Sequence, residues 1–268
     1  MTSAPAGSLV RASHPGPALA VTTLTAALAT ASDLSPGRTV LVTLAVAAGQ
    51  LSIGWSNDLL DRERDSAVGR TDKPLVSGRL DPSVVRGACG AALVGTGVLS
   101  VACGVVPGLV HLGCVASGWS YNLGLKATVW SWLPYAITFG GLPVFVVLAA
   151  PGAAPPPPWM VAAGALLGVG AHLVNVLPDL ADDAATGVRG LPHRIGARWT
   201  PPLAVAILTV ASLVIAREAE ALPVTVMVVA LAAVAGLAVL TLVAGGRTPF
   251  RAAMGIALVD AVMLVMAE

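Results

Sequence analysis

The sequence has little charge and few aromatic residues for its length. Lys, Arg, Asp and Glu make up 11% of its 268 residues, and Phe, Trp and Tyr only 4%, whereas about a quarter of the residues in a soluble globular domain are charged. The charge deficit excludes an ordinary soluble domain, and the lack of a basic stripe argues against nucleic-acid binding. The cysteines lie in apolar segments without metal or redox spacing, which indicates packing residues: Cys89, Cys103 and Cys114.

The apolar residues are gathered into long runs, and the mean hydropathy is +0.84. Nine runs of roughly 17–22 residues are long enough, as helices, to cross about 30 Å of hydrocarbon. They lie near 16–32, 39–56, 84–103, 106–122, 129–150, 159–177, 200–216, 222–243 and 250–267. We interpret the first as a membrane span rather than a signal peptide because eight similar runs follow it. We expect an all-α, polytopic membrane protein, a nine-transmembrane-helix bundle forming a single domain over residues 1–268.

Basic residues are concentrated in alternate loops between the apolar runs. If every run crosses the membrane, thirteen of the fifteen Lys and Arg residues lie on one side, and only Arg38 and Arg217 lie on the other. The side rich in Lys and Arg is normally cytoplasmic. We therefore expect a cytoplasmic N-terminus and an external C-terminus, and the Ala-, Val-, Gly- and Arg-rich composition indicates a bacterial cell membrane.

Acidic residues are concentrated in two loops on the predicted cytoplasmic side, at about 57–83 and 178–199, which hold nine of the fourteen. Seven of these nine belong to two motifs, NDLLDRERD at 57–65 and NVLPDLADD at 175–183. Each motif has an amide and two carboxylates four residues apart: Asn57, Asp61 and Asp65 in one, Asn175, Asp179 and Asp183 in the other. Residues four apart share one face of a helix, so each set would be aligned if its helix continues. Pro178 could kink the second helix.

This pattern predicts a metal site. Carboxylates crowded on one face repel each other and are costly near lipid unless a cation neutralises them. Mg²⁺ prefers oxygen ligands and typically takes one or two carboxylates together with substrate phosphates. The two motifs could hold Mg²⁺ on either side of a diphosphate and stabilise its charge as it leaves. The alternative for one motif alone is a solvated acidic loop, but identical spacing in two motifs on one side favours the metal site.

The motifs strongly resemble those of the UbiA superfamily of intramembrane prenyltransferases, which has nine transmembrane helices, a first NDxxDxxxD motif and a second DxxxD motif. The matching residues here are Asn57, Asp58, Asp61, Asp65, Asp179 and Asp183. The resemblance implies a central cavity open to the cytoplasm and Mg²⁺-dependent ionisation of a polyprenyl diphosphate. The resulting allylic cation is usually captured by an aromatic acceptor. Some members are instead terpene cyclases acting on farnesyl or geranylgeranyl diphosphate, and this alternative stays open because no acceptor-reading group stands out.

On this basis the chain is expected to be an enzyme that transfers prenyl groups. Catalysis and Mg²⁺ binding are assigned to Asp58, Asp61, Asp65, Asp179 and Asp183. Diphosphate binding is assigned to Asn57, Asn175, Lys73, Tyr121, Lys126 and Arg11. YNLGLK at 121–126 is similar to a family segment that contacts the diphosphate. The positive-inside bias could instead account for Lys73, and anchoring at the membrane interface for Arg11.

We expect the chain to bind an isoprenoid diphosphate, the lipid bilayer and a small lipophilic acceptor, with no nucleic acid and no obligatory protein partner. A transporter is disfavoured because the acids lie at helix ends rather than near the bilayer midplane. Two residues keep alternatives open. Asp260, within the ninth run, is either a packing residue or a functional group facing the interior, and His193 in LPHRIG at 191–196 could belong to a lid.

Overall fold

The computed structural model describes residues 5–220, 222–244 and 248–267, apart from the side chains of Pro5, Ala181 and Asp182. The regular structure in these ranges is helical. The long helices are α2 (Pro15–Ala31), α3 (Pro36–Ala67), α4 (Pro82–Ala102), α5 (Val105–Asn122), α6 (Leu133–Leu148), α7 (Pro158–Val176), α10 (Thr200–Glu218), α11 (Val224–Val243) and α12 (Thr248–Met266). The short elements are α1 (Pro5–Arg11), α8 (Leu180–Ala185), α9 (Leu191–Ile195) and the 3₁₀ turns η1 (Leu125–Ala127) and η2 (Leu177–Asp179).

In the part of the chain that the structure describes, six helical segments are long and apolar enough to cross a membrane: α3, α4, α7 with η2, α10, α11 and α12. Each of the nine predicted runs overlaps one long helix, but α6, with 16 residues, is a shorter apolar helix. The described residues thus confirm an all-helical fold with several membrane spans. The count of nine crossings stays a prediction, because α2, α5 and α6 are not among these six segments.

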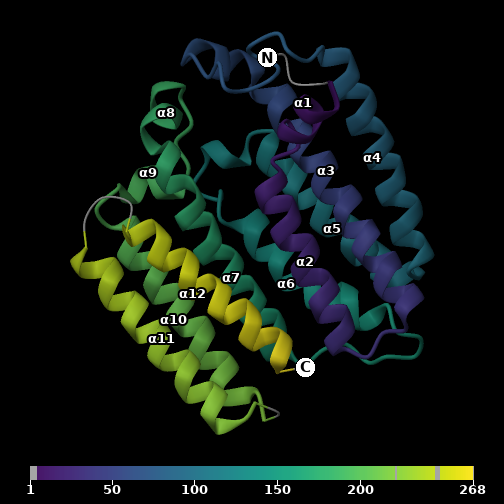
Figure 1. Ribbon diagram of the computed structural model, residues 1–268, viewed down its shortest axis with the longest axis vertical. Coiled ribbons are helices and arrows are strands. Elements are labelled where there is room, and N and C mark those ends of the chain that lie inside the picture. Colours follow the sequence, from purple (N-terminus) through teal and green to yellow (C-terminus); the bar gives the residue numbers. More distant parts are fainter. Residues whose placement is uncertain (1–4, 221, 245–247, 268) are drawn as a thin grey trace.

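The long helices form a closed bundle (Figure 1). Consecutive helices pack side by side from α2 to α7, and α7 then packs against α10 and α12. α12 also contacts α2, so helices from the two ends of the chain lie together. α11 packs against α10 and α12 and buries few of its residues. The apolar core lies where these helices meet, at Leu28, Val42, Phe145, Met160 and Ile215, each at most 1% exposed.

The polar elements gather at one end of the bundle. α8 and α9 lie on one side of this end and α1 on the other, whereas α12 ends at the opposite end of the bundle (Figure 1). α3 carries the first acidic motif to this polar end, because its 32 residues continue without a break from Pro36 to Ala67. The expectation of one continuous helical face is therefore confirmed for the first motif.

The same expectation is wrong for the second motif. α7 ends at Val176, η2 follows over Leu177–Asp179, and α8 begins at Leu180. Pro178 explains the break, because proline lacks an N–H and its ring collides with the preceding turn of an α-helix. The three spaced side chains of this motif consequently lie on three different elements.

Candidate active site

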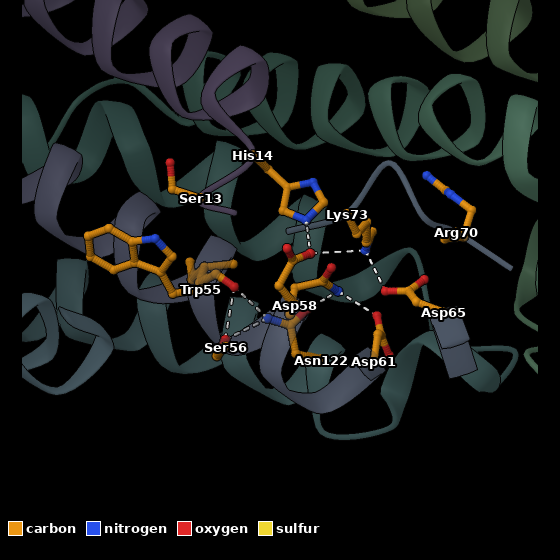
Figure 2. A network of polar contacts seen from close by, with 12 residues as sticks. Ser13, His14, Trp55, Ser56, Asp58, Asp61, Asp65, Arg70, Lys73 and Asn122 are labelled. Carbon is orange, nitrogen blue, oxygen red and sulfur yellow. Dashed lines mark hydrogen bonds and ion pairs between the residues drawn. The ribbon is translucent and has the colours of Figure 1, made fainter. Parts of the chain in front are cut away.

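Asn57 and Asp61 of the first motif, one turn apart on α3, contact each other. Asn57 Nδ2 donates to Asp61 Oδ2 at 2.9 Å and to Asn122 Oδ1 at 3.3 Å. Asn122 in turn donates to the Ser56 hydroxyl at 2.8 Å and the Ile53 carbonyl at 2.9 Å, which ties α5 to α3 (Figure 2). Asn122 was not predicted, although it lies in the predicted YNLGLK segment.

Lys126 reaches the same carboxylate from η1. Its Nζ donates to Asp61 Oδ1 at 2.6 Å, and Arg64 contacts that oxygen at 3.1 Å. The side chains of Lys126 and Asp61 are only 8% and 14% exposed, so this ion pair is nearly buried, whereas Arg64 reaches it from a more exposed position. The structure thus brings together Lys126 and Asp61, two residues that the sequence assigned separately to diphosphate and metal.

Lys73, in the loop after α3, bridges two acids of the first motif. Its Nζ lies 2.9 Å from Asp58 Oδ1 and 2.7 Å from Asp65 Oδ2 (Figure 2). Burial by itself would lower the pKa of Lys73, but the negative charges of Asp58 and Asp65 outweigh it and raise the pKa above its usual value. The ammonium therefore stays protonated beside the motif.

Asp58 differs from the other motif acids. It is 2% exposed, and its Oδ1 also contacts His14 Nε2 at 2.8 Å. It is turned about 100° around the helix from Asn57 but only about 20° from Asp65, which follows it by seven residues. The sequence grouped Asp58 with the metal-binding acids and gave no signal for His14, a lone histidine between two helices.

The second motif is spread over a wider area. Asn175 Nδ2 donates to the Tyr135 hydroxyl at 3.4 Å, and Asp179 lies 3.6 Å from Arg70, on the loop after the first motif. Asp183 Oδ2 lies 3.5 Å from His193 Nε2, which brings α9 against α8. A lid role for His193 stays a prediction. The salt bridge to Arg70 links the two motifs across the polar end.

One pocket collects acids from both motifs. Its empty space, open solvent included, is about 320 Å³, and it is lined by Asp61, Arg64, Asp65, Val68, Arg70, Lys126, Asp183, Thr186 and Val188. Burial, followed by the charge of Asp179, raises the pKa of Asp183 to about 6. Negative charge at Asp183 is therefore only partly compensated, and a bound cation would relieve this.

The donor set of this pocket fits Mg²⁺ together with a phosphate group. Three carboxylates offer the oxygen ligands that Mg²⁺ prefers, and Arg64, Arg70 and Lys126 offer charged donors for phosphate oxygens. Among the residues that the structure describes, no three His, Cys, Asp or Glu side chains already form a compact metal-binding group. Instead, lysines contact the carboxylates of the first motif.

Several predicted binding residues lie outside the pocket lining. Arg11 is exposed at the end of α1. Tyr121 packs edge-on against Tyr135, with ring centroids 5.4 Å apart, and against His172, at 5.8 Å. The roles of Arg11 and Tyr121 stay predictions.

A second pocket lies between α2, α3, α5 and α6, with about 310 Å³ of empty space, open solvent included. Apolar side chains form most of its lining, including Val46, Ile53, Val115, Leu142 and Phe145. Ile53 stands on α3 one turn before Asn57. An apolar space therefore begins close to the first motif and extends into the bundle.

Residues 18–259 match the profile of the UbiA prenyltransferase family. This chain belongs to that family. Among curated relatives, the bacteriochlorophyll synthase 33 kDa chain of Cereibacter sphaeroides is 34% identical over 185 residues, which cover 63% of this chain and 59% of the relative. Digeranylgeranylglyceryl phosphate synthase of Methanothrix thermoacetophila is 32% identical over 171 residues, covering 59% of this chain and 58% of the relative. The matched region spans less than two thirds of either relative.

Solved structures of UbiA homologues share the fold. A homologue from Archaeoglobus fulgidus bound to GPP and Mg²⁺ has a TM-score of 0.73, with 16% identity and coverage of 97% of this chain and 98% of the other. The apo homologue from Aeropyrum pernix K1 has a TM-score of 0.74, with 17% identity and coverage of 91% and 96%. The UbiA fold is therefore present over nearly the whole chain.

Proposed function

We propose that this UbiA family member is a Mg²⁺-dependent prenyltransferase that ionises an isoprenoid diphosphate and transfers the prenyl group to a lipophilic acceptor. The pocket lined by Asp61 and Asp65 of the first motif and Asp183 of the second carries this proposal. The named relatives and the homologue bound to GPP and Mg²⁺ support the same class of reaction.

In this proposal the acidic residues bind the metal and the basic residues bind the diphosphate. Asp61, Asp65, Asp179 and Asp183 would hold Mg²⁺, with Asn57 and Asn175 orienting ligands or contacting phosphate. Bound Mg²⁺ supplies positive charge that stabilises the departing diphosphate. Lys126, Arg64 and Arg70 bind phosphate oxygens through charge-assisted hydrogen bonds, and Lys73 approaches from the adjoining loop.

The reaction begins with heterolysis of the allylic C–O bond, and the electron pair leaves with the diphosphate. The charged donors stabilise this leaving group, while the apolar pocket between α2, α3, α5 and α6 takes the hydrocarbon chain and keeps water from the cation. Tyr121 and Tyr135 pack edge-on against each other, and an aromatic ring face exposed to the cation would attract it. The acceptor then forms a bond to the allylic carbon and loses a proton.

The enzyme would work as one domain of nine membrane-spanning helices, with the polar end and the N-terminus in the cytoplasm. The bias of Lys and Arg towards that side supports this orientation. The pocket would then open to the compartment that supplies soluble Mg²⁺. Reporter fusions before α1 and after α12 test the topology, since the proposal requires opposite locations.

A product assay tests the function. Purified enzyme with Mg²⁺ is given geranyl, farnesyl or geranylgeranyl diphosphate, with and without lipid-soluble acceptors from the host membrane. We expect diphosphate release and a prenylated acceptor, and both should be lost in Asp61→Ala and Asp179→Ala. A cyclic hydrocarbon formed without acceptor would identify a terpene cyclase instead, and unchanged turnover in both variants would contradict the metal assignment.

A further inference from the structure

Asp58 belongs to the first acidic motif in sequence but to a different neighbourhood in space. Its carboxylate is buried, does not line the active-site pocket, and contacts two cationic or ionisable partners through one oxygen. Those partners are His14 Nε2 at 2.8 Å and Lys73 Nζ at 2.9 Å (Figure 2). Asp58 therefore lies outside the pocket that would hold the metal, and its Oδ1 is shared by the two donors that keep it there.

The junction between α1 and α2 packs against α3 next to Asp58. A Cβ on Gly54, one turn before Asp58, would lie 2.1 Å from the carbonyl oxygen of Ser13, so only glycine allows this approach. Trp55 Nε1 donates to the Leu9 carbonyl at 3.0 Å. His14 itself has φ 53° and ψ 62°, a left-handed conformation that residues other than glycine rarely adopt. These contacts hold the His14 ring beside Asp58.

Lys73 connects this junction to the pocket. Its ammonium is shared between Asp58 and Asp65, at 2.9 and 2.7 Å. A divalent cation on Asp65 would repel the ammonium and compete for the same carboxylate. Asp58 would still retain Lys73 at the pocket edge, because its own carboxylate is committed to Lys73 and His14.

We propose that Asp58 and His14 are positioning residues that hold Lys73 for the diphosphate, and that Asp58 is not a metal ligand. When the cation binds Asp65, the Lys73 ammonium turns from Asp65 to a phosphate oxygen while it keeps its contact with Asp58. The inference rests on the proposed function and makes the junction between α1 and α2 part of the substrate site.

The test separates metal affinity from diphosphate affinity in the full-length protein. Mn²⁺ binding without diphosphate is followed by electron paramagnetic resonance, and inorganic diphosphate is used as a competitive inhibitor of prenyl transfer. Asp58→Asn and His14→Ala are compared with Asp61→Asn and with Glu63→Gln, an exposed acid of the same motif. His14 has a side chain 40% exposed, so its replacement is expected to fold even if Asp58→Asn does not.

We expect Asp58→Asn and His14→Ala to keep Mn²⁺ affinity within about threefold of the unmodified protein. Both should raise the inhibition constant of diphosphate and the KM of the prenyl diphosphate about tenfold, with a smaller change in kcat. Asp61→Asn should weaken Mn²⁺ binding at least about tenfold, and Glu63→Gln should change neither property.

A double-mutant cycle shows whether Asp58 acts through Lys73. In a Lys73→Gln background, adding Asp58→Asn should cause no further loss of diphosphate affinity, because the ammonium to be positioned is gone. Fully additive losses would overturn the proposal, as would a loss of Mn²⁺ affinity in Asp58→Asn equal to that in Asp61→Asn. If the unmodified protein binds neither Mn²⁺ nor diphosphate, the proposed function itself fails.

Discussion

The ammonium of Lys126 lies 2.6 Å from Oδ1 of Asp61, although the two residues are 65 positions apart in the chain. Lys126 stands on the short turn after α5, and Asp61 on α3. Their side chains are only 8% and 14% exposed. This contact joins the first acidic motif to the segment at 121–126 and defines the centre of the site.

Replacing Asp61 by Asn should lower kcat/KM at least about 100-fold, because a cation that stabilises the leaving group contributes several kcal/mol. Asp33→Asn is a matched control. Asp33 lies in the exposed turn between α2 and α3, at the end of α3 remote from the motif, with φ 53°, which Asn tolerates. Steady-state kinetics on both variants check this, and equal activities would contradict the role of Asp61.

Removal of divalent metal should abolish turnover. With excess chelator the pocket acids lack the charge that neutralises them, and diphosphate cannot leave. Addition of Mg²⁺ should restore activity. Mg²⁺ with inorganic diphosphate should also raise the Tm in detergent, because ligands that bind only the folded state stabilise it. Asp61→Asn should lose this Tm shift, and full turnover in chelator would refute the metal dependence.

Gly190 should be intolerant of a side chain. A Cβ there would lie 2.5 Å from the Lys126 carbonyl oxygen and 2.8 Å from Ser131 Oγ. Ser131 accepts a hydrogen bond from the Leu191 N–H at 2.9 Å, so it joins the start of α9 to the Lys126 turn. Gly190→Ala should therefore displace Lys126 from Asp61 and raise the KM for the prenyl diphosphate about tenfold.

The control for Gly190→Ala is Gly113→Ala. Gly113 lies on an exposed position of α5, and a Cβ there meets nothing within 4 Å. Its replacement should leave KM unchanged. Activities are compared per folded molecule, measured by size-exclusion chromatography in detergent. A normal KM in well-folded Gly190→Ala would show that the Lys126 turn adapts without loss.

The apolar pocket should limit the length of the prenyl chain. Leu142 is 7% exposed and lines this pocket from α6. Leu142→Trp should fill part of its volume and reduce kcat/KM for geranylgeranyl diphosphate more than for geranyl diphosphate, by about tenfold in the ratio. Because the ratio is taken within one variant, a general loss of stability cancels. An unchanged ratio would place the hydrocarbon chain elsewhere.

The sequence predicted those features that depend on local pattern. The apolar runs predicted the positions of the long helices, and the spacing of Asn57, Asp61 and Asp65 predicted that they lie along one continuous helix, α3. For the second motif, the spacing alone was misleading, although Pro178 indicated the kink that divides the motif among three elements. The sequence failed where contacts between distant segments decide. It could not reveal His14, because the approach of the α1–α2 junction to α3 depends on packing between distant segments.

Asp260 is expected to have a structural rather than a catalytic role. It is fully buried on α12, lines neither of the two pockets, and accepts a hydrogen bond from Ser212 on α10 at 2.5 Å. Asn can accept the same hydrogen bond and avoids an ionised group inside the membrane, where charge is costly. Asp260→Asn should therefore keep the Tm and kcat/KM, whereas Asp260→Ala should lose about 1–3 kcal/mol of stability and keep its activity per folded molecule. An inactive Asp260→Asn with an unchanged Tm would instead show that Asp260 takes part in the reaction.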